Sequence, residues 1–295
     1  QALFELAMEC NPLQSGPDQV QRLDRLEVEM PNLFQVFALP CPSTEQRRTT
    51  LRIATQAAYG WDLRGRWNEG LETLGRLLAE EDPPDLAHLR GQLLKLAGNL
   101  AVNRGTYDEA HDLFQQGLEL LEGTGDEQAV SVTLGSLGNV LMRKGDLDGA
   151  RRQHAEALSR LRPTGYEPGI AACLGNLGAV ALLQKDLEAA ESYLEGALAI
   201  FRRLENRWAI GYVLDNLGLI AIERRDLVRG EAITDQAVEI HREINDPRGL
   251  SQALANRAAL AQLAGDLPRA RRNLAESLRI GREIGDRSGL IADLE

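Results

Sequence analysis

The sequence is poor in aromatic residues and in cysteine. Phe, Trp and Tyr make up 4% of its 295 residues, although 43% are hydrophobic. This composition is typical of packed helices and argues against a β-sandwich. The cysteines, Cys10, Cys41 and Cys173, are far apart, odd in number and fit no metal-ligand spacing. We therefore expect unpaired thiols in a reducing compartment, which points to the cytoplasm.

The sequence also lacks long apolar runs and an excess of positive charge. No apolar run approaches the roughly 18 to 20 residues that cross a bilayer, and no signal-peptide pattern opens the sequence, so we expect no membrane partner. The net charge is −11, and lysine occurs at positions 95, 144 and 185 alone. An acidic chain does not attract phosphate backbones, which argues against direct binding of nucleic acid.

A six-residue motif recurs with a period of 40 and without an insertion. Its copies begin at residues 65, 105, 145, 185, 225 and 265. The first residue is usually Gly, which can end a helix in the left-handed conformation, and an Asp at the second position can cap the next helix. A small sixth residue lets two helices approach closely. The motif predicts the turn of an antiparallel helical hairpin.

Apolar residues at helical spacing predict a helix of about 15 residues before each turn and another after it. In the first helix a Leu is followed four residues later by a small residue, as in Leu134 and Gly138. We expect this alternation of large and small side chains to interlock neighbouring hairpins. The second helix should end at the turn-forming stretches 124–126, 163–165, 205–206, 245–247 and 285–286.

These positions resemble the tetratricopeptide repeat, with Leu at four, Gly or Ala at eight, Ala at twenty and a small residue at twenty-seven. The resemblance covers residues 46–295 and implies an all-α superhelix, or solenoid, of helical hairpins. The usual repeat has 34 residues and often a Pro near its end, where this chain has Glu122, Arg162 and Arg202. The second helices are therefore expected to run longer. Residues 289–295 begin another copy, so we expect a seventh repeat that is cut off and a fragment of a longer protein.

Residues 1–45 do not follow the repeat and are predicted to form a helical lead-in to an upstream domain. One helix is expected to start at Gly16-Pro17-Asp18 and to run to about Glu29. A second helix is expected to open at Pro31 and to end by Pro40.

The lead-in is similar to the junction before the repeats of bacterial signal-transduction ATPases, the STAND regulators. That junction reads Leu-Glu-x-Glu, two residues, then Asn-Leu, and the matching positions here are Leu26, Glu27, Glu29, Asn32 and Leu33. The resemblance implies that the repeats are a sensor arm. No Gly-x-x-x-x-Gly-Lys-Ser/Thr loop occurs in the sequence, so any ATPase activity is expected before Gln1.

In stacked hairpins the first helices line the concave surface, so polar residues that recur on them are candidates for ligand binding. Asn176, Asn216 and Asn256 form a ladder with a period of 40, and Asn99 and Asn139 lie three positions further on in earlier repeats. A carboxamide both donates and accepts, which suits the backbone of an extended peptide, and similar asparagine ladders line the groove of kinesin light chain. The alternative is that these side chains bond to backbone between helices, as buried Asn does.

Further residues are predicted by their spacing to face the same surface, although each of them could instead be a solvated or packing residue. They are Arg52, Tyr59, Lys95, Asn103, Arg143, Tyr212 and Gln252.

No catalytic or metal-binding constellation emerges, and we expect neither an enzyme nor a cofactor. The four histidines, at 88, 111, 154 and 241, share no repeat position and no ligand spacing, so they are interpreted as structural or surface residues.

The sequence therefore predicts a ligand- or partner-binding repeat domain that serves as the sensor arm of a larger bacterial signalling ATPase or transcriptional regulator. The expected partner is a peptide, a protein, another domain of the same protein, or a small effector. The alternative is a constitutive scaffold that holds a peptide or protein without switching.

Overall fold

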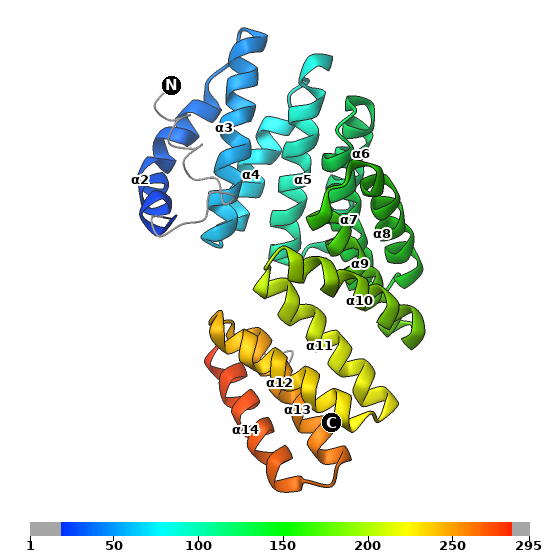
Figure 1. Cartoon of the computed structure of the whole chain (residues 1–295). Coiled ribbons are helices and arrows are strands. Elements are labelled where there is room, and N and C mark those ends of the chain that lie inside the picture. Colours follow the sequence, from blue (N-terminus) through cyan, green and yellow to red (C-terminus); the bar gives the residue numbers. More distant parts are fainter. Residues whose placement is uncertain (1–18, 285–295) are drawn as a thin grey trace. The chain divides into compact units, whose positions relative to one another are not determined.

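The chain folds into consecutive α-helical hairpins, as a computed structural model that describes residues 19–284 shows (Figure 1). No strand occurs in this part of the chain, and the predicted all-α fold class is confirmed. The predicted helix start at residues 16–18, the turn at 285–286 and the partial seventh repeat lie outside the described residues. The predicted division into a lead-in of residues 1–45 and repeats from residue 46 to 295 stays a prediction.

The helices gather into two compact units, Gln1–Arg160 and Leu161–Glu295. The helices of the first unit are α2 (Gln19–Ala38), α3 (Thr44–Leu63), α4 (Trp67–Leu78), the 3-10 helix η2 (Pro84–Leu86), α5 (Ala87–Arg104), α6 (Tyr107–Leu121), η3 (Glu122–Thr124), α7 (Glu127–Arg143) and α8 (Leu147–Leu161). The second unit continues with η4 (Arg162–Thr164), α9 (Glu167–Leu183), α10 (Leu187–Arg203), α11 (Arg207–Arg224), α12 (Leu227–Glu243), α13 (Pro247–Leu263) and α14 (Leu267–Glu283). No helix among the described residues is long and apolar enough to cross a membrane.

Each hairpin has a first helix, which we call helix A, and a second, helix B. The A helices are α3, α5 and α7 in the first unit and α9, α11 and α13 in the second. Within each unit, successive A helices contact one another, and Figure 1 shows α3 beside α5. Each unit has its own apolar core between its helices.

From residue 19 to residue 38 the lead-in forms a single helix, where a break before Pro31 was predicted. Helix α2 runs through Pro31, which lies inside it, so the expected break before this residue is wrong. Proline costs one backbone hydrogen bond in a helix interior, and tertiary packing offsets that loss here. The rings of Phe34 and Phe37 each lie with their centroid 6.2 Å from that of Trp61 on α3, and Trp61 is fully buried. The predicted end before Pro40 is confirmed.

The turns repeat with a period of 20, which is half the sequence period. Residues with a positive φ lie at 65, 105, 125, 145, 165, 185, 205, 225, 245 and 265. The turn within a hairpin and the turn between hairpins therefore end their helices in the same left-handed conformation. The residue that follows usually caps the next helix, with a side-chain oxygen 2.8 to 3.2 Å from a backbone nitrogen three residues on. These caps are Asp126, Asp146, Asp186, Asn206, Asp226, Asp246 and Asp266.

The glycines at the small position of the A helices have their nearest contacts within their own hairpins. A Cβ added to Gly98 would lie 2.6 Å from the Phe114 ring on α6, and one added to Gly138 would lie 2.7 Å from the His154 ring on α8. The predicted alternation of large and small residues is therefore present, but its placement between neighbouring hairpins is wrong. The 40-residue period of this pattern does not indicate which helix packs against the small residue.

We expect Glu205→Gly to stabilise the second unit. Glu205 has φ 52°, a conformation that strains a side-chain-bearing residue and suits glycine. The gain should be about 0.5 to 1 kcal/mol, measured as the free energy of unfolding in urea. The matched control is Gly165→Ala, one repeat earlier at φ 67°, which should cost about as much. If both substitutions changed the free energy of unfolding in the same direction, the strain argument would be contradicted.

We expect His154→Leu to stabilise the first unit, most of all in mild acid. His154 is fully buried, neither ring nitrogen has a hydrogen-bond partner, and burial lowers its pKa to about 4. The unfolded state takes up its proton near pH 6.5, so the unit should lose stability as the pH falls from 6.5 towards 4, by about 1 to 3 kcal/mol. Leucine occupies the corresponding position 194, beside Gly178. Urea unfolding of both proteins at pH 5 and pH 7.5 measures the difference, and an unchanged acid response would refute it.

Candidate functional site

The sequence-predicted site residues of the first unit lie in rows along its three A helices. Lys95, Asn99 and Asn103 follow one another at four-residue intervals on α5, which places them on one side of the helix. The remaining ones are Arg52 and Tyr59 on α3 and Asn139 and Arg143 on α7. We call this surface the unit-1 face, and all its members are half-buried or exposed.

Three basic residues lie on the unit-1 face. Arg52 and Arg143 are exposed, and Lys95 is half-buried. Burial lowers the pKa of the Lys95 ammonium, and the charge of Asp126 opposes that shift. Asn103 donates a hydrogen bond from its carboxamide to Asp62 Oδ1, so this asparagine is partly engaged within the protein.

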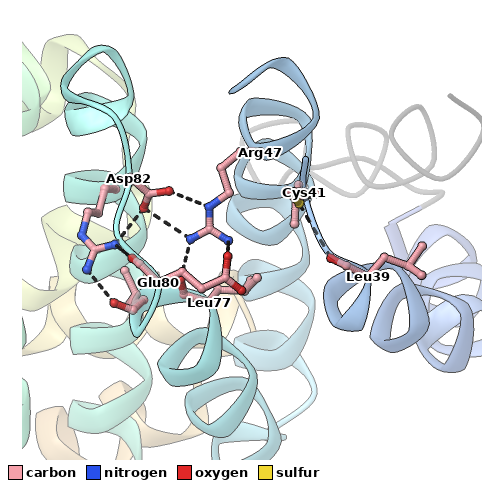
Figure 2. A network of polar contacts seen from close by, with 9 residues as sticks. Leu39, Cys41, Arg47, Leu77, Glu80 and Asp82 are labelled. Atoms are coloured by element: carbon pink, nitrogen blue, oxygen red, sulfur yellow. Dashed lines mark hydrogen bonds and ion pairs between the residues drawn. The ribbon is translucent and has the colours of Figure 1, made fainter. Parts of the chain in front are cut away.

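The turn before α5 is held by the buried Arg47 and the half-buried Arg90 (Figure 2). Arg47 Nε lies 2.5 Å from Asp82 Oδ1, and Arg47 Nη2 donates to the backbone oxygen of Leu77 at 2.6 Å. Arg90 Nη1 donates to Asp82 Oδ2 at 2.7 Å. Burial opposes the charge of Asp82, but the hydrogen bonds and charges of both arginines outweigh it and hold the pKa of that carboxyl below its ordinary value.

This network replaces the usual turn chemistry. Position 85 is the register position at which a positive-φ residue would fall, but Pro83 and Pro84 lead there into the 3-10 helix η2. The arginine-carboxylate cluster therefore fixes the start of α5 and with it the row of Lys95. Sequence reasoning missed it because Arg47 and Asp82 lie 35 residues apart and do not recur in other repeats.

The second unit presents its predicted residues on α9, α11 and α13. Asn176, Tyr212, Asn216, Gln252 and Asn256 lie at matching levels of these three helices. We call this surface the unit-2 face. Three of its levels bear no charged residue, and they consist of Ala172, Tyr212, Gln252, Asn176, Asn216, Asn256, Ala179, Leu219 and Ala259. In a chain with 26% charged residues, such a neutral surface is a distinct feature.

An exposed aromatic pair lies on the unit-2 face. The rings of Trp208 and Tyr212 are nearly parallel, with planes at 5° and centroids 6.1 Å apart. Trp208 is 62% exposed, although a side chain of this size is usually covered. Sequence reasoning missed Trp208, and the available signal was its position four residues before Tyr212 on the same helix.

The asparagine ladder of the second unit is not uniform. Asn256 is 3% exposed, and its Nδ2 donates to the backbone oxygen of Asp215 at 3.1 Å, from α13 to α11. This is the alternative considered above, a side chain that bonds to backbone between helices. Asn216 is half-buried and donates to the oxygen of Tyr212 in its own helix, whereas Asn176 is half-buried on α9. Asn256 therefore positions helices, and its neighbours remain the ligand candidates.

The two buried histidines differ in their surroundings. His154 has no hydrogen-bond partner for its ring, whereas both ring nitrogens of His241 face carboxylates. Among residues 19–284, no three His, Cys, Asp or Glu side chains form a group that could hold a metal ion.

Comparison with known proteins agrees with this architecture. Residues 129–203 match the model of the tetratricopeptide repeat family. Together with the repeated hairpins, this match shows a tetratricopeptide-like solenoid fold, as the sequence predicted. A search of curated proteins found no relative of this sequence.

Several solved structures share the fold at low sequence identity. A STAND protein with a tetratricopeptide repeat sensor, PH0952 from Pyrococcus horikoshii, has 16% identity and a TM-score of 0.73 over 99% of this chain and 43% of its own. A Rap protein complexed with competence and sporulation factor has 14% identity and a TM-score of 0.72, with 99% and 78% covered. The quorum sensor NprR from B. thuringiensis has 11% identity and a TM-score of 0.65, also with 99% and 78% covered.

We expect Asp82→Ala to destabilise the first unit by about 3 kcal/mol, because it leaves Arg47 buried without its main counter-charge. The matched control is Asp85→Ala, which removes the exposed ion pair with Arg48 at 2.7 Å and should change stability by about 0.5 kcal/mol or less. Urea unfolding measures both. If Asp82→Ala were as mild as the control, the cluster would not fix the turn.

Proposed function

We propose that the chain is a partner-binding domain that serves as the sensor or regulatory arm of a larger signalling ATPase or transcriptional regulator in the cytoplasm. The observation that carries the proposal is the exposed pair of Trp208 and Tyr212 on the unit-2 face, three levels of which bear no charge. The partner is a peptide or protein, possibly another domain of the same protein, or a small effector. The domain itself catalyses no reaction.

The aromatic pair supports binding on energetic grounds. An exposed tryptophan keeps a large apolar area in water, and burial of apolar area contributes roughly 25 cal/mol per Å². Aromatic residues in such positions are frequent anchors of interfaces. The carboxamides of Asn176, Asn216 and Gln252 beside the rings can pair with the backbone of an extended peptide, which needs both donors and acceptors. A partner segment fits this face if it has an apolar side chain and, on either side of it, backbone N–H and C=O groups that are free to form hydrogen bonds.

The unit-1 face suits a different part of a partner. Arg52, Lys95 and Arg143 supply positive charge within a chain of net charge −11. The uncharged carboxamides of Asn99 and Asn139 lie among them. This combination favours a segment that carries carboxylates or other anionic groups.

The sensor role rests on the relatives and on the junction-like sequence at residues 26–33. PH0952 is described as having a repeat sensor, and NprR as a quorum sensor. A ligand that binds one arrangement of the repeats better than another shifts the equilibrium between them, and the shift can be passed to an attached domain. A constitutive scaffold would bind with no such shift. The coding sequence upstream of Gln1 separates the two roles, because a phosphate-binding loop followed by a winged helix supports the sensor and their absence refutes it.

We expect Trp208→Ala combined with Tyr212→Ala to weaken binding of a peptide at least tenfold, because the aromatic anchor is removed. The peptide is one selected on the wild-type chain from a random library, and calorimetry measures its affinity. The control is Val228→Ala, which removes an apolar side chain that is 84% exposed on α12 and should leave the affinity unchanged. Equal affinity of all three proteins would exclude the unit-2 face as the binding surface.

A further inference from the structure

A buried histidine between two carboxylates lies directly beneath the unit-2 face. His241 on α12 is 2% exposed. Its Nε2 lies 3.0 Å from Oδ2 of Asp215 on α11, and its Nδ1 lies 3.1 Å from Oδ2 of Asp246, in the turn before α13. Gly211 and Gly249 cover the ring so closely that an added Cβ would lie 2.7 Å and 2.1 Å from it. The imidazole therefore has a fitted site between three helices.

This geometry favours a charged imidazole. A neutral ring has one N–H and one lone pair, so it can donate to one carboxylate while the lone pair repels the other. The imidazolium donates to both Asp215 and Asp246. Burial disfavours its charge, but the hydrogen bonds and charges of these carboxylates outweigh burial and hold the pKa of His241 above its ordinary value. Burial raises the pKa of Asp215, and His241 opposes that shift.

The two carboxylates differ in their freedom to move. Asp215 is enclosed, with its side chain 11% exposed and its Oδ1 without a hydrogen-bond partner. Asp246 reaches solvent on one side, and its Oδ1 accepts from the backbone N–H of Gly249, which caps α13. When His241 loses a proton to the solvent, the enclosed Asp215 retains the remaining N–H. The bond to Asp246 is the one that breaks, because this side chain can turn towards water.

We infer that His241 is a protonation-sensitive latch that couples Asp215 to the N-terminal cap of α13. In the charged state the latch holds Asp246 in place, and α13 starts at Pro247 with its cap formed. In the neutral state Asp246 is released and the first turn of α13 loosens. The latch is closed while the histidine is protonated and opens as the pH rises through its raised pKa.

The latch acts on residues of the unit-2 face. Helix α13 carries Gln252, whose Nε2 donates to Asn256 Oδ1 at 3.1 Å, and Asn256 in turn donates to the backbone of Asp215. Gln252 and Asn256 therefore lie on the helix whose first turn the latch controls, and Asn256 also joins this helix to Asp215. The regulatory meaning of the latch rests on the proposed function, whereas its existence does not.

Amide hydrogen exchange in the intact chain tests the latch without any partner. The protection factor of the Gly249 amide, corrected for the intrinsic rate at each pH, should fall at least tenfold between pH 6 and pH 9. The fall should follow the NMR titration of the His241 ring. The internal control is the Arg269 amide, which Asp266 caps in the same way at 3.0 Å on α14 without a histidine. Its protection should change less than twofold.

Two variants make the test specific. Asp246→Asn keeps a capping oxygen and removes the charge, so the pH response of Gly249 should disappear and the pKa of His241 should fall. His241→Gln removes the titrating group and should leave Gly249 weakly protected at every pH. If His241→Gln does not fold, the comparison of Gly249 protection between the wild type and Asp246→Asn still tests the latch.

The proposal is overturned if Gly249 keeps its protection while His241 titrates, if His241 titrates at or below pH 6.5, or if Asp246→Asn retains the wild-type response. The hydrogen-exchange result could be as expected while Trp208→Ala with Tyr212→Ala leaves the peptide affinity unchanged. In that case the latch would stand, and only the proposed function would be refuted.

Discussion

The strict half-period rhythm of the backbone is the constraint on which the other features depend. From α5 to α13, each helix is followed closely, in places after a 3-10 turn, by a residue with positive φ. Most of the next helices begin at a side-chain cap, as at Gly145 and Asp146. Because the helices from α8 to α14 are nearly equal in length, successive A helices start at the same level. Side chains one full period apart then come to lie at matching levels on one surface. Without this rhythm, neither the unit-1 face nor the unit-2 face would be continuous.

Electrostatic interactions act on this frame at two points. The cluster of Arg47, Asp82 and Arg90 holds the turn at position 85, which lacks the usual left-handed residue. The site of His241 holds the cap of α13 through Asp246. In both places a buried cation pairs with carboxylates from other parts of the chain. A buried charge of this kind costs desolvation and adds little net stability, but it specifies one arrangement.

The periodic part of the structure could be predicted from the sequence because it results from local chemistry. Glycine, aspartate and small residues at fixed spacing identified the turns and the hairpins. Features that occur once could not be predicted in this way. Pro31 lies within a helix because Phe34 and Phe37 pack on Trp61, and Asn256 is buried although its register matches two less buried asparagines. Periodicity showed which residues share a level, whereas burial and partners depend on neighbouring helices.

The common spacing also limits how such a chain can change in length. One residue inserted within a helix turns all later side chains of that helix by about 100°, so its polar row would point away from its neighbours. Loss of one full period between equivalent turns keeps every cap and every level in register. Whole hairpins are therefore the natural unit by which this array can lengthen or shorten, and the size of the partner it can hold would change in the same steps.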